Sequence, residues 1–115
     1  MLDMDKLLRT EIGSYERLSW TGEIGGQSIT LYAKPITTAD ATRISKGGES
    51  NAVEGMVAAI ILKAEDEHGE KVFKPAHKAL LRRMATTKIT EIFGALFGAQ
   101  LDEETDESFE ERVGN

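Results

Sequence analysis

The spacing of hydrophobic positions changes along the chain from helical to alternating and back to helical. Met4, Leu7 and Leu8 recur at helical spacing. This pattern predicts a short helix over residues 2–11, where two early aspartates favour the helix start, and Gly13 ends it. The first element of the fold is therefore expected to be an amphipathic helix.

Two runs of alternating hydrophobic and polar residues follow this helix. Leu18 and Trp20 share one face of the first run, and a glycine-rich segment over residues 22–26 separates it from the second. In the second run the apolar face consists of Ile29, Leu31 and Ala33. The pattern predicts a β-hairpin with one buried face and with Trp20 in the core. Because a lone hairpin is marginal in water, other elements must cover that face.

Helical spacing returns after Pro35 and predicts up to four more helices. Residues 37–40 read Thr-Thr-Ala-Asp, a capping-box pattern that opens a short helix. The next helix has an apolar stripe that starts at Val53, and the one after it has Pro75 in its first turn. The last helix ends near Gly98, and its apolar stripe consists of Ile89, Ile92, Phe93, Leu96 and Phe97. The expected fold class is α+β and mostly helical, with an N-terminal β-hairpin packed against four or five helices.

Charge is distributed unevenly along the chain. The 115 residues hold 20 acidic and 14 basic side chains, for a net charge of −6. Seven of the acids lie in residues 102–111, so that residues 1–101 are balanced and carry no basic patch for nucleic-acid phosphates. We expect residues 1–101 to form a single folded domain and residues 102–115 to form a disordered acidic tail.

The residues that usually carry catalysis or bind cofactors occur without the required spacing. The chain has no cysteine, which excludes disulfides and thiolate metal sites. Gly22, Gly25 and Gly26 lack the spacing of a dinucleotide-binding loop, and a hairpin loop is the better interpretation. His68 is expected to be exposed in a turn, and His77 to be half-buried on a helix. We therefore expect no enzyme activity, no cofactor and no metal site.

Membrane insertion and secretion are also not expected. The longest apolar run, residues 56–62, is too short to cross a bilayer. Residues 1–10 lack the basic region and apolar run of a secretory signal. The absence of cysteine suits a reducing cytoplasm, which is the expected location.

Two groups of residues are candidates for binding a partner protein. The last helix carries large apolar groups for so short an element, and although most of its stripe is expected in the core, its C-terminal end is expected to be exposed. The candidates on this helix are Phe93, Leu96 and Phe97. The preceding helix has a basic side that could hold the acidic tail or an acidic partner. Its candidates are Lys78, Arg82 and Arg83.

The order of these features resembles the tail assembly chaperones of phages with long flexible tails. The resemblance covers residues 15–100, and two motifs support it. Residues 65–73 have the form acid-acid-x-x-Gly-x-x-x-Phe, and the closing helix contains Ile89-Thr90-Glu91-Ile92. The resemblance implies a non-catalytic protein that binds the tape-measure protein and recruits the major tail (tube) protein. It also implies a protein that acts in the cytoplasm of the bacterial host and is absent from the mature virion.

Members of this family often have a longer form made by a −1 ribosomal slip. The codons GTG-GGA-AAC would encode the final Val113-Gly114-Asn115 and contain a slippery heptanucleotide, so the residues permit such a slip. Two alternatives to the chaperone remain open. One is a structural minor tail or head–tail connector protein, and the other is an acidic inhibitor that mimics nucleic acid. The oligomeric state also remains open, with a homo-oligomer among the possibilities.

Overall fold

A computed structural model describes residues 2–47 and 52–98, and within them the chain has the expected mostly helical α+β fold. The elements, in chain order, are α1 (Met4–Gly13), β1 (Leu18–Ile24), β2 (Gln27–Ala33), α2 (Thr38–Gly47), α3 (Ala52–Lys63), the 3₁₀ turn η1 (Pro75–His77), α4 (Lys78–Leu81) and α5 (Thr86–Phe97). The predicted acidic tail and the domain boundary at residue 101 lie outside the described residues.

The β-hairpin has the predicted strands and buried face. β1 and β2 pair antiparallel, with Trp20 opposite Leu31 and Ile24 opposite Gln27. The two residues that join the strands, Gly25 and Gly26, have φ values of 64° and 84°. A two-residue hairpin loop with positive φ at both positions twists in the same sense as the strands, and glycine adopts this conformation without strain.

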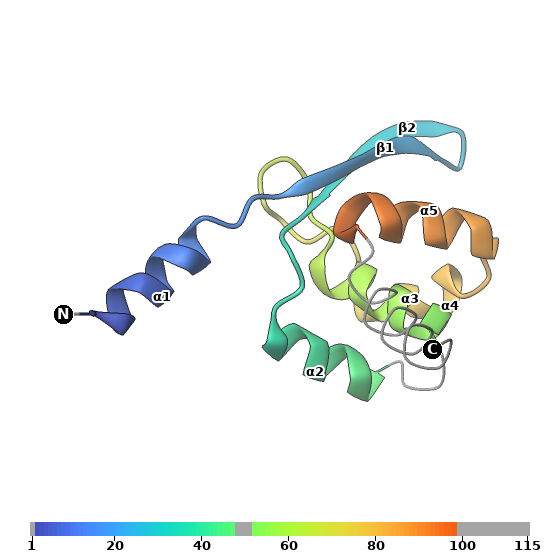
Figure 1. Cartoon of the computed structure of the whole chain (residues 1–115). Coiled ribbons are helices and arrows are strands. Elements are labelled where there is room, and N and C mark those ends of the chain that lie inside the picture. The colour runs from blue at the N-terminus through green and yellow to red at the C-terminus, as the bar shows by residue number, and fades with distance from the viewer. Residues whose placement is uncertain (1, 48–51, 99–115) are drawn as a thin grey trace, which may run out of the picture.

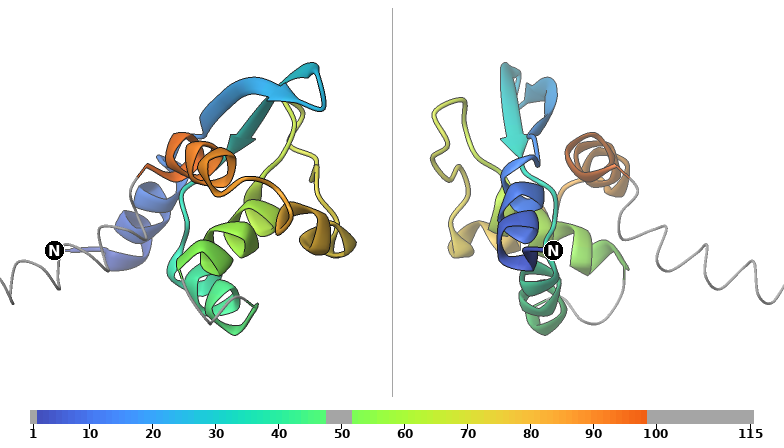
Figure 2. Two further views of the ribbon diagram at one scale, coloured as in Figure 1. Left: turned by 90° about the vertical axis from the view of Figure 1, so that its right-hand side faces the viewer. Right: turned by 60° about the vertical axis from the view of Figure 1, so that its left-hand side comes forward.

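The core is built in layers, with α5 between the hairpin and α3 (Figures 1 and 2). The apolar stripe of α5 packs on the buried face of the hairpin, which includes Trp20 and Leu31, and on α3. α2 and α4 pack against α3. This arrangement supplies the cover that the hairpin requires, because a two-stranded sheet alone buries too little apolar surface.

The prediction of one continuous helix that starts at Pro75 is wrong. The structure has the 3₁₀ turn η1 and the single-turn helix α4, which ends at Leu81. The N–H groups of Arg83 and Met84 donate to the carbonyls three residues earlier, at 3.0 and 3.1 Å, which is the tighter 3₁₀ spacing. In this short segment Leu81 is buried, whereas Leu80, the residue before it, is exposed.

The capping box predicted at the start of α2 is confirmed. The Asp40 N–H group donates to Thr37 Oγ1 at 3.1 Å, and the Thr37 N–H group donates to Asp40 Oδ2 at 3.0 Å. Lys63 Nζ, from the end of α3, also lies 2.7 Å from Asp40 Oδ2. Partial burial raises the pKa of Asp40, but the hydrogen bonds from Lys63 and Thr37 outweigh it and hold the pKa below its ordinary value.

The Asp40 carboxylate should make the stability of the fold depend on pH. Because its pKa is lower in the folded chain than in the unfolded chain, it stabilises the fold above about pH 4, and this contribution is lost as the pH falls through the folded pKa. We expect Asp40→Asn to have a lower free energy of unfolding than the wild type near neutral pH, and we expect this difference to become smaller in acid. Urea unfolding at about pH 6 and about pH 3 measures the difference, and an equal difference at both pH values would contradict the prediction.

Candidate protein-binding surface

α1 is a well-formed helix at one end of the chain. The Asp3 carboxylate accepts from the Lys6 N–H group at 3.2 Å and caps the helix start. Asp5 and Arg9 form an i,i+4 ion pair at 3.0 Å on its polar side. At the other end the Ser14 N–H group donates to the Glu11 carbonyl at 3.1 Å. Local interactions therefore account for both ends of α1.

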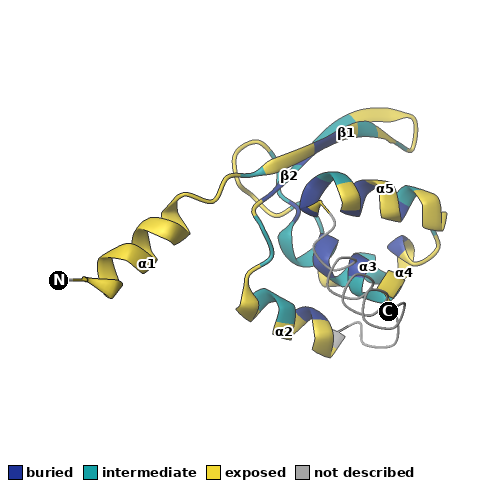
Figure 3. Cartoon of the chain, viewed as in Figure 1, coloured by how far each residue is buried: buried dark blue, intermediate teal, exposed yellow. Residues whose placement is uncertain are grey.

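The apolar side of α1 is exposed along its whole length. The helix projects away from the rest of the fold, and none of its residues is buried (Figures 1 and 3). Met4, Leu8 and Ile12 follow one another at i, i+4 and i+8, and their exposed fractions are 52%, 55% and 64%. We call the set the arm surface, which consists of Leu2, Met4, Leu7, Leu8, Ile12 and Tyr15.

An open hollow continues the arm surface onto the body of the protein. It has a volume of about 570 Å³ and lies between the end of α1 and the segment that joins β2 to α2. Ile12 and Tyr15 line it from the arm side, and Pro35 and Ile36 line it from the body side. Apolar side chains thus continue from α1 across the hollow to the start of α2.

The exposure of the arm surface has a physical cost that binding would remove. An isolated helix of about ten residues is marginal in water, and most helices in proteins are stabilised by packing an amphipathic face. α1 has such a face but packs no buried residue with it. Exposed apolar side chains gathered on one side of a helix are a candidate interaction site, and here they lie around the exposed Glu11. The arm surface is therefore the strongest candidate for a partner-binding site in the described residues.

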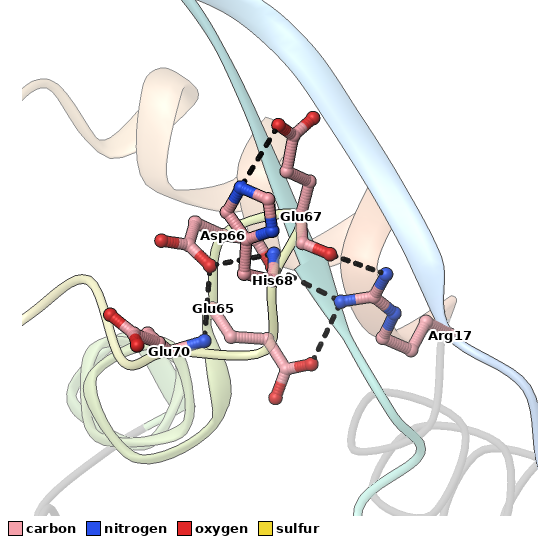
Figure 4. A network of polar contacts seen from close by, with 6 residues as sticks. All are labelled: Arg17, Glu65, Asp66, Glu67, His68 and Glu70. Atoms are coloured by element: carbon pink, nitrogen blue, oxygen red, sulfur yellow. Dashed lines mark hydrogen bonds and ion pairs between the residues drawn. The ribbon is translucent and has the colours of Figure 1, made fainter.

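Arg17 fixes the point at which the arm meets the body (Figure 4). Its guanidinium donates to Glu65 Oε1 at 3.0 Å and to the backbone carbonyls of Asp66 and Glu67 at 3.1 and 3.3 Å. The same group lies 4.4 Å from the centre of the Tyr32 ring, a cation–π contact. Glu65 begins an acidic loop that follows α3. Backbone hydrogen bonds of 2.9 and 2.8 Å between Tyr32 and Glu65 attach this loop to β2.

The acidic loop that Arg17 contacts is a folded turn. Asp66 Oδ1 accepts from the N–H groups of His68 and Glu70 at 2.8 and 3.0 Å (Figure 4). The hydrogen bond from the Glu70 N–H group has the largest effect, and together with the smaller effect of the His68 N–H group it holds the pKa of the Asp66 carboxyl below its ordinary value. Gly69 has a φ of 83°, which the turn requires. The Asp66 carboxylate therefore builds the turn. Among the described residues no group of His, Asp or Glu has the arrangement of a metal site.

The expected environments of both histidines are confirmed. His68 is exposed, and its Nε2 lies 3.3 Å from Glu67 Oε2. His77 is half-buried, and its Nδ1 accepts from the Lys74 N–H group at 2.9 Å. Its ring also packs edge-on against Phe73, with 6.0 Å between centroids. His77 therefore has a structural part in η1.

The prediction that the end of α5 is exposed is wrong. Phe93, Leu96 and Phe97 have exposed fractions of 1%, 0% and 2%. The rings of Phe93 and Phe97 lie 5.1 Å apart and pack with the hairpin and α3. The physical reason is the shortness of the other elements: two strands and a twelve-residue helix need large side chains from α5 to fill the space between them. These three residues build the core of the described chain.

The three predicted basic residues lie in different surroundings. Arg82 Nε lies 3.0 Å from Glu54 Oε2 and so ties α4 to α3. Lys78 is half-buried and lines a groove beside α3, whereas Arg83 is exposed and does not line it. Lys78 is thus the member of this set that lines the groove beside α3.

The sequence predicts the helix α1 but does not mark its residues as a binding site. The available signal was the spacing of Met4, Leu8 and Ile12, which equals that of core positions elsewhere in the chain. What the sequence did not show is that no other described element covers this face.

Comparisons with other proteins do not assign a family. Within the described parts of the chain, no helix has both the length and the apolar composition needed to span a bilayer. No protein-family model matches the chain, and no curated protein or solved structure matches it either.

Proposed function

We propose that this protein is a non-catalytic tail assembly chaperone of phages with long flexible tails. In this role it binds the tape-measure protein and recruits the major tail protein, which forms the tail tube. It acts in the cytoplasm of the bacterial host and is absent from the mature virion. The motifs in residues 65–73 and 89–92 support the family, and the exposed arm surface supports protein binding as the activity.

The arm surface is the single observation that carries protein binding as the activity in this proposal. A short amphipathic helix binds by laying its apolar side chains at i, i+4 and i+8 into a groove of its partner or along a partner helix. Met4, Leu8 and Ile12 have this spacing, and the hollow beside Tyr15 extends the contact onto the body. The body then serves as the rigid support for a binding arm.

Charge on the arm surface should weaken binding without unfolding the body. We expect Leu8→Asp and Ile12→Asp each to weaken capture of the tape-measure protein from the same genome at least tenfold, or about 1.4 kcal/mol, because each buries a carboxylate in an apolar interface. Co-expression and pull-down measure the loss. The thermal midpoint should stay within a few degrees, because no residue of α1 is buried.

Thr10→Asp is the matched control for both variants. Position 10 lies on the polar side of the same helix, where Thr10 Oγ1 donates to the Lys6 carbonyl, so the same charge should leave capture unchanged. Equal capture by all four proteins would show that α1 is not the binding surface. Detection of the protein in purified virions by mass spectrometry would contradict the chaperone and favour a structural tail component.

A further inference from the structure

The outer edge of β2 has one paired position and two open ones. Tyr32 and Glu65 exchange two backbone hydrogen bonds, of 2.9 and 2.8 Å, on the side of β2 that faces away from β1. Backbone direction alternates along an antiparallel strand, so the N–H and C=O groups of Thr30 and Ser28 point the same way as those of Tyr32. Within the described residues these outward groups have no hydrogen-bond partner. Glu65 thus occupies the first position of a third strand, and β2 can pair with more.

A groove lies beside these two open positions. It has a volume of about 360 Å³ and separates β2 from the acidic loop that follows Glu65 (Figures 2 and 4). Ser28 and Thr30 are two residues apart, or about 7 Å along a strand, so an extended segment of three or four residues spans both. We call this feature the strand groove, and its lining includes Ser28, Thr30, Tyr32, Asp66, Glu67 and His68.

The opposite edge of the hairpin is protected by a lysine. Lys88 Nζ, from α5, donates to the carbonyl of Glu23 in β1 at 3.0 Å and lies 5.6 Å from the centre of the Trp20 ring. A lysine held at a sheet edge hinders the addition of another strand. In the part of the chain that the structure describes, no Lys or Arg lines the strand groove. The two edges therefore differ, and the edge of β2 is the one that can accept a further strand.

The strand groove is acidic. Asp66 and Glu67 supply its carboxylates, and the nearby guanidinium of Arg17 already lies 3.0 Å from the Glu65 carboxylate. His68 Nε2 lies 3.3 Å from Glu67 Oε2, but the two side chains are 76% and 68% exposed, and ion pairs at such exposed positions are weak. A basic side chain that enters the groove would therefore meet two carboxylates.

We propose that the strand groove binds an extended, basic segment of another protein by strand addition. The segment pairs its backbone with Ser28 and Thr30, continues the third strand that Glu65 begins, and places a lysine or arginine beside Glu67. In this mode of recognition the main-chain hydrogen bonds supply affinity and the alternate side chains supply specificity. The site shares no residue with the arm surface, so the proposal stands independently of the function proposed above.

Peptide titration followed by amide NMR on the full-length protein tests strand addition. The probe is a capped six-residue peptide, Thr-Lys-Thr-Lys-Thr-Lys. We expect it to shift the amide resonances of Ser28 and Thr30 and to slow their hydrogen exchange. The same peptide with every backbone nitrogen methylated, or with glutamate in place of lysine, should not have these effects. Unchanged Ser28 and Thr30 amides with the lysine peptide, or equal effects of the methylated peptide, would overturn the proposal.

Three variants separate the strand groove from general electrostatics. Glu67→Lys should weaken binding of the lysine peptide about fivefold. Glu16→Lys changes the net charge equally at an exposed position outside the groove lining, so it should leave binding unchanged. Ser28→Pro removes an outward N–H group, which an edge strand tolerates, and should also weaken binding.

Two results from these variants would overturn the site. One is equal weakening by Glu67→Lys and Glu16→Lys, and the other is full affinity in folded Ser28→Pro. Sedimentation equilibrium without peptide identifies a competing occupant. If the protein dimerises and the Ser28 and Thr30 amides shift with its concentration, the occupant is a second copy of the chain and the proposed partner is wrong.

Discussion

Phe97→Ala should lower the free energy of unfolding by about 3–5 kcal/mol, the usual cost of deleting a buried phenylalanine ring. Phe97 lies in the last turn of α5, is buried, and packs against the ring of Phe93. Small domains have a total stability of about 5–15 kcal/mol, so this single change removes a large part of it. For a domain of about 100 residues, the thermal midpoint should fall by more than about 12 °C.

Leu80→Ala is the control, because it removes an apolar side chain that is 57% exposed on α4. We expect it to change stability by less than about 0.5 kcal/mol. Circular dichroism during heating and urea unfolding compare the two variants. A fall of only a few degrees for Phe97→Ala would contradict its place in the core and would favour the exposed binding role that the sequence suggested.

The contrast between α1 and α5 shows how far hydrophobic spacing can be interpreted. Met4, Leu8 and Ile12 have the same i, i+4, i+8 spacing as Ile89, Phe93 and Phe97, and both sets are helical as predicted. The first set is exposed and the second is buried. Periodicity depends on nearest neighbours in the sequence, whereas burial depends on which distant element covers the face. The spacing therefore predicts two amphipathic helices but does not predict which of them has an exposed apolar face.

Other features were predictable because the interactions that form them are local. The capping box at Thr37 and the glycine turn of the hairpin each depend on residues within a few positions of one another. The contact of Arg17 with the acidic loop, and the strand groove between β2 and that loop, join residues far apart in the chain. No pattern in one sequence encodes such pairs, so the binding sites were less predictable than the elements.

Gly22→Ala should lower stability by about 1–3 kcal/mol, the usual cost of overpacking a well-packed core. A Cβ atom at position 22 would lie 2.4 Å from Cζ2 of Trp20 and 2.9 Å from its Cη2. The indole cannot move aside easily, because it is buried and its Nε1 donates to Glu91 Oε2 at 2.8 Å. Replacing glycine also restricts the unfolded chain, a gain of about 0.4–1 kcal/mol, so the clash should dominate.

Two further variants test whether the clash with the Trp20 ring causes the loss of stability in Gly22→Ala. Gly94→Ala is the control, since a Cβ atom there meets nothing within 4 Å and alanine should stabilise α5 by up to about 1 kcal/mol. Trp20→Phe removes the ring atoms that the new Cβ atom would strike. In that background Gly22→Ala should cost little, which gives a coupling energy of about 1–3 kcal/mol between the two positions. Additive effects in urea unfolding would instead place the strain of Gly22→Ala elsewhere in β1.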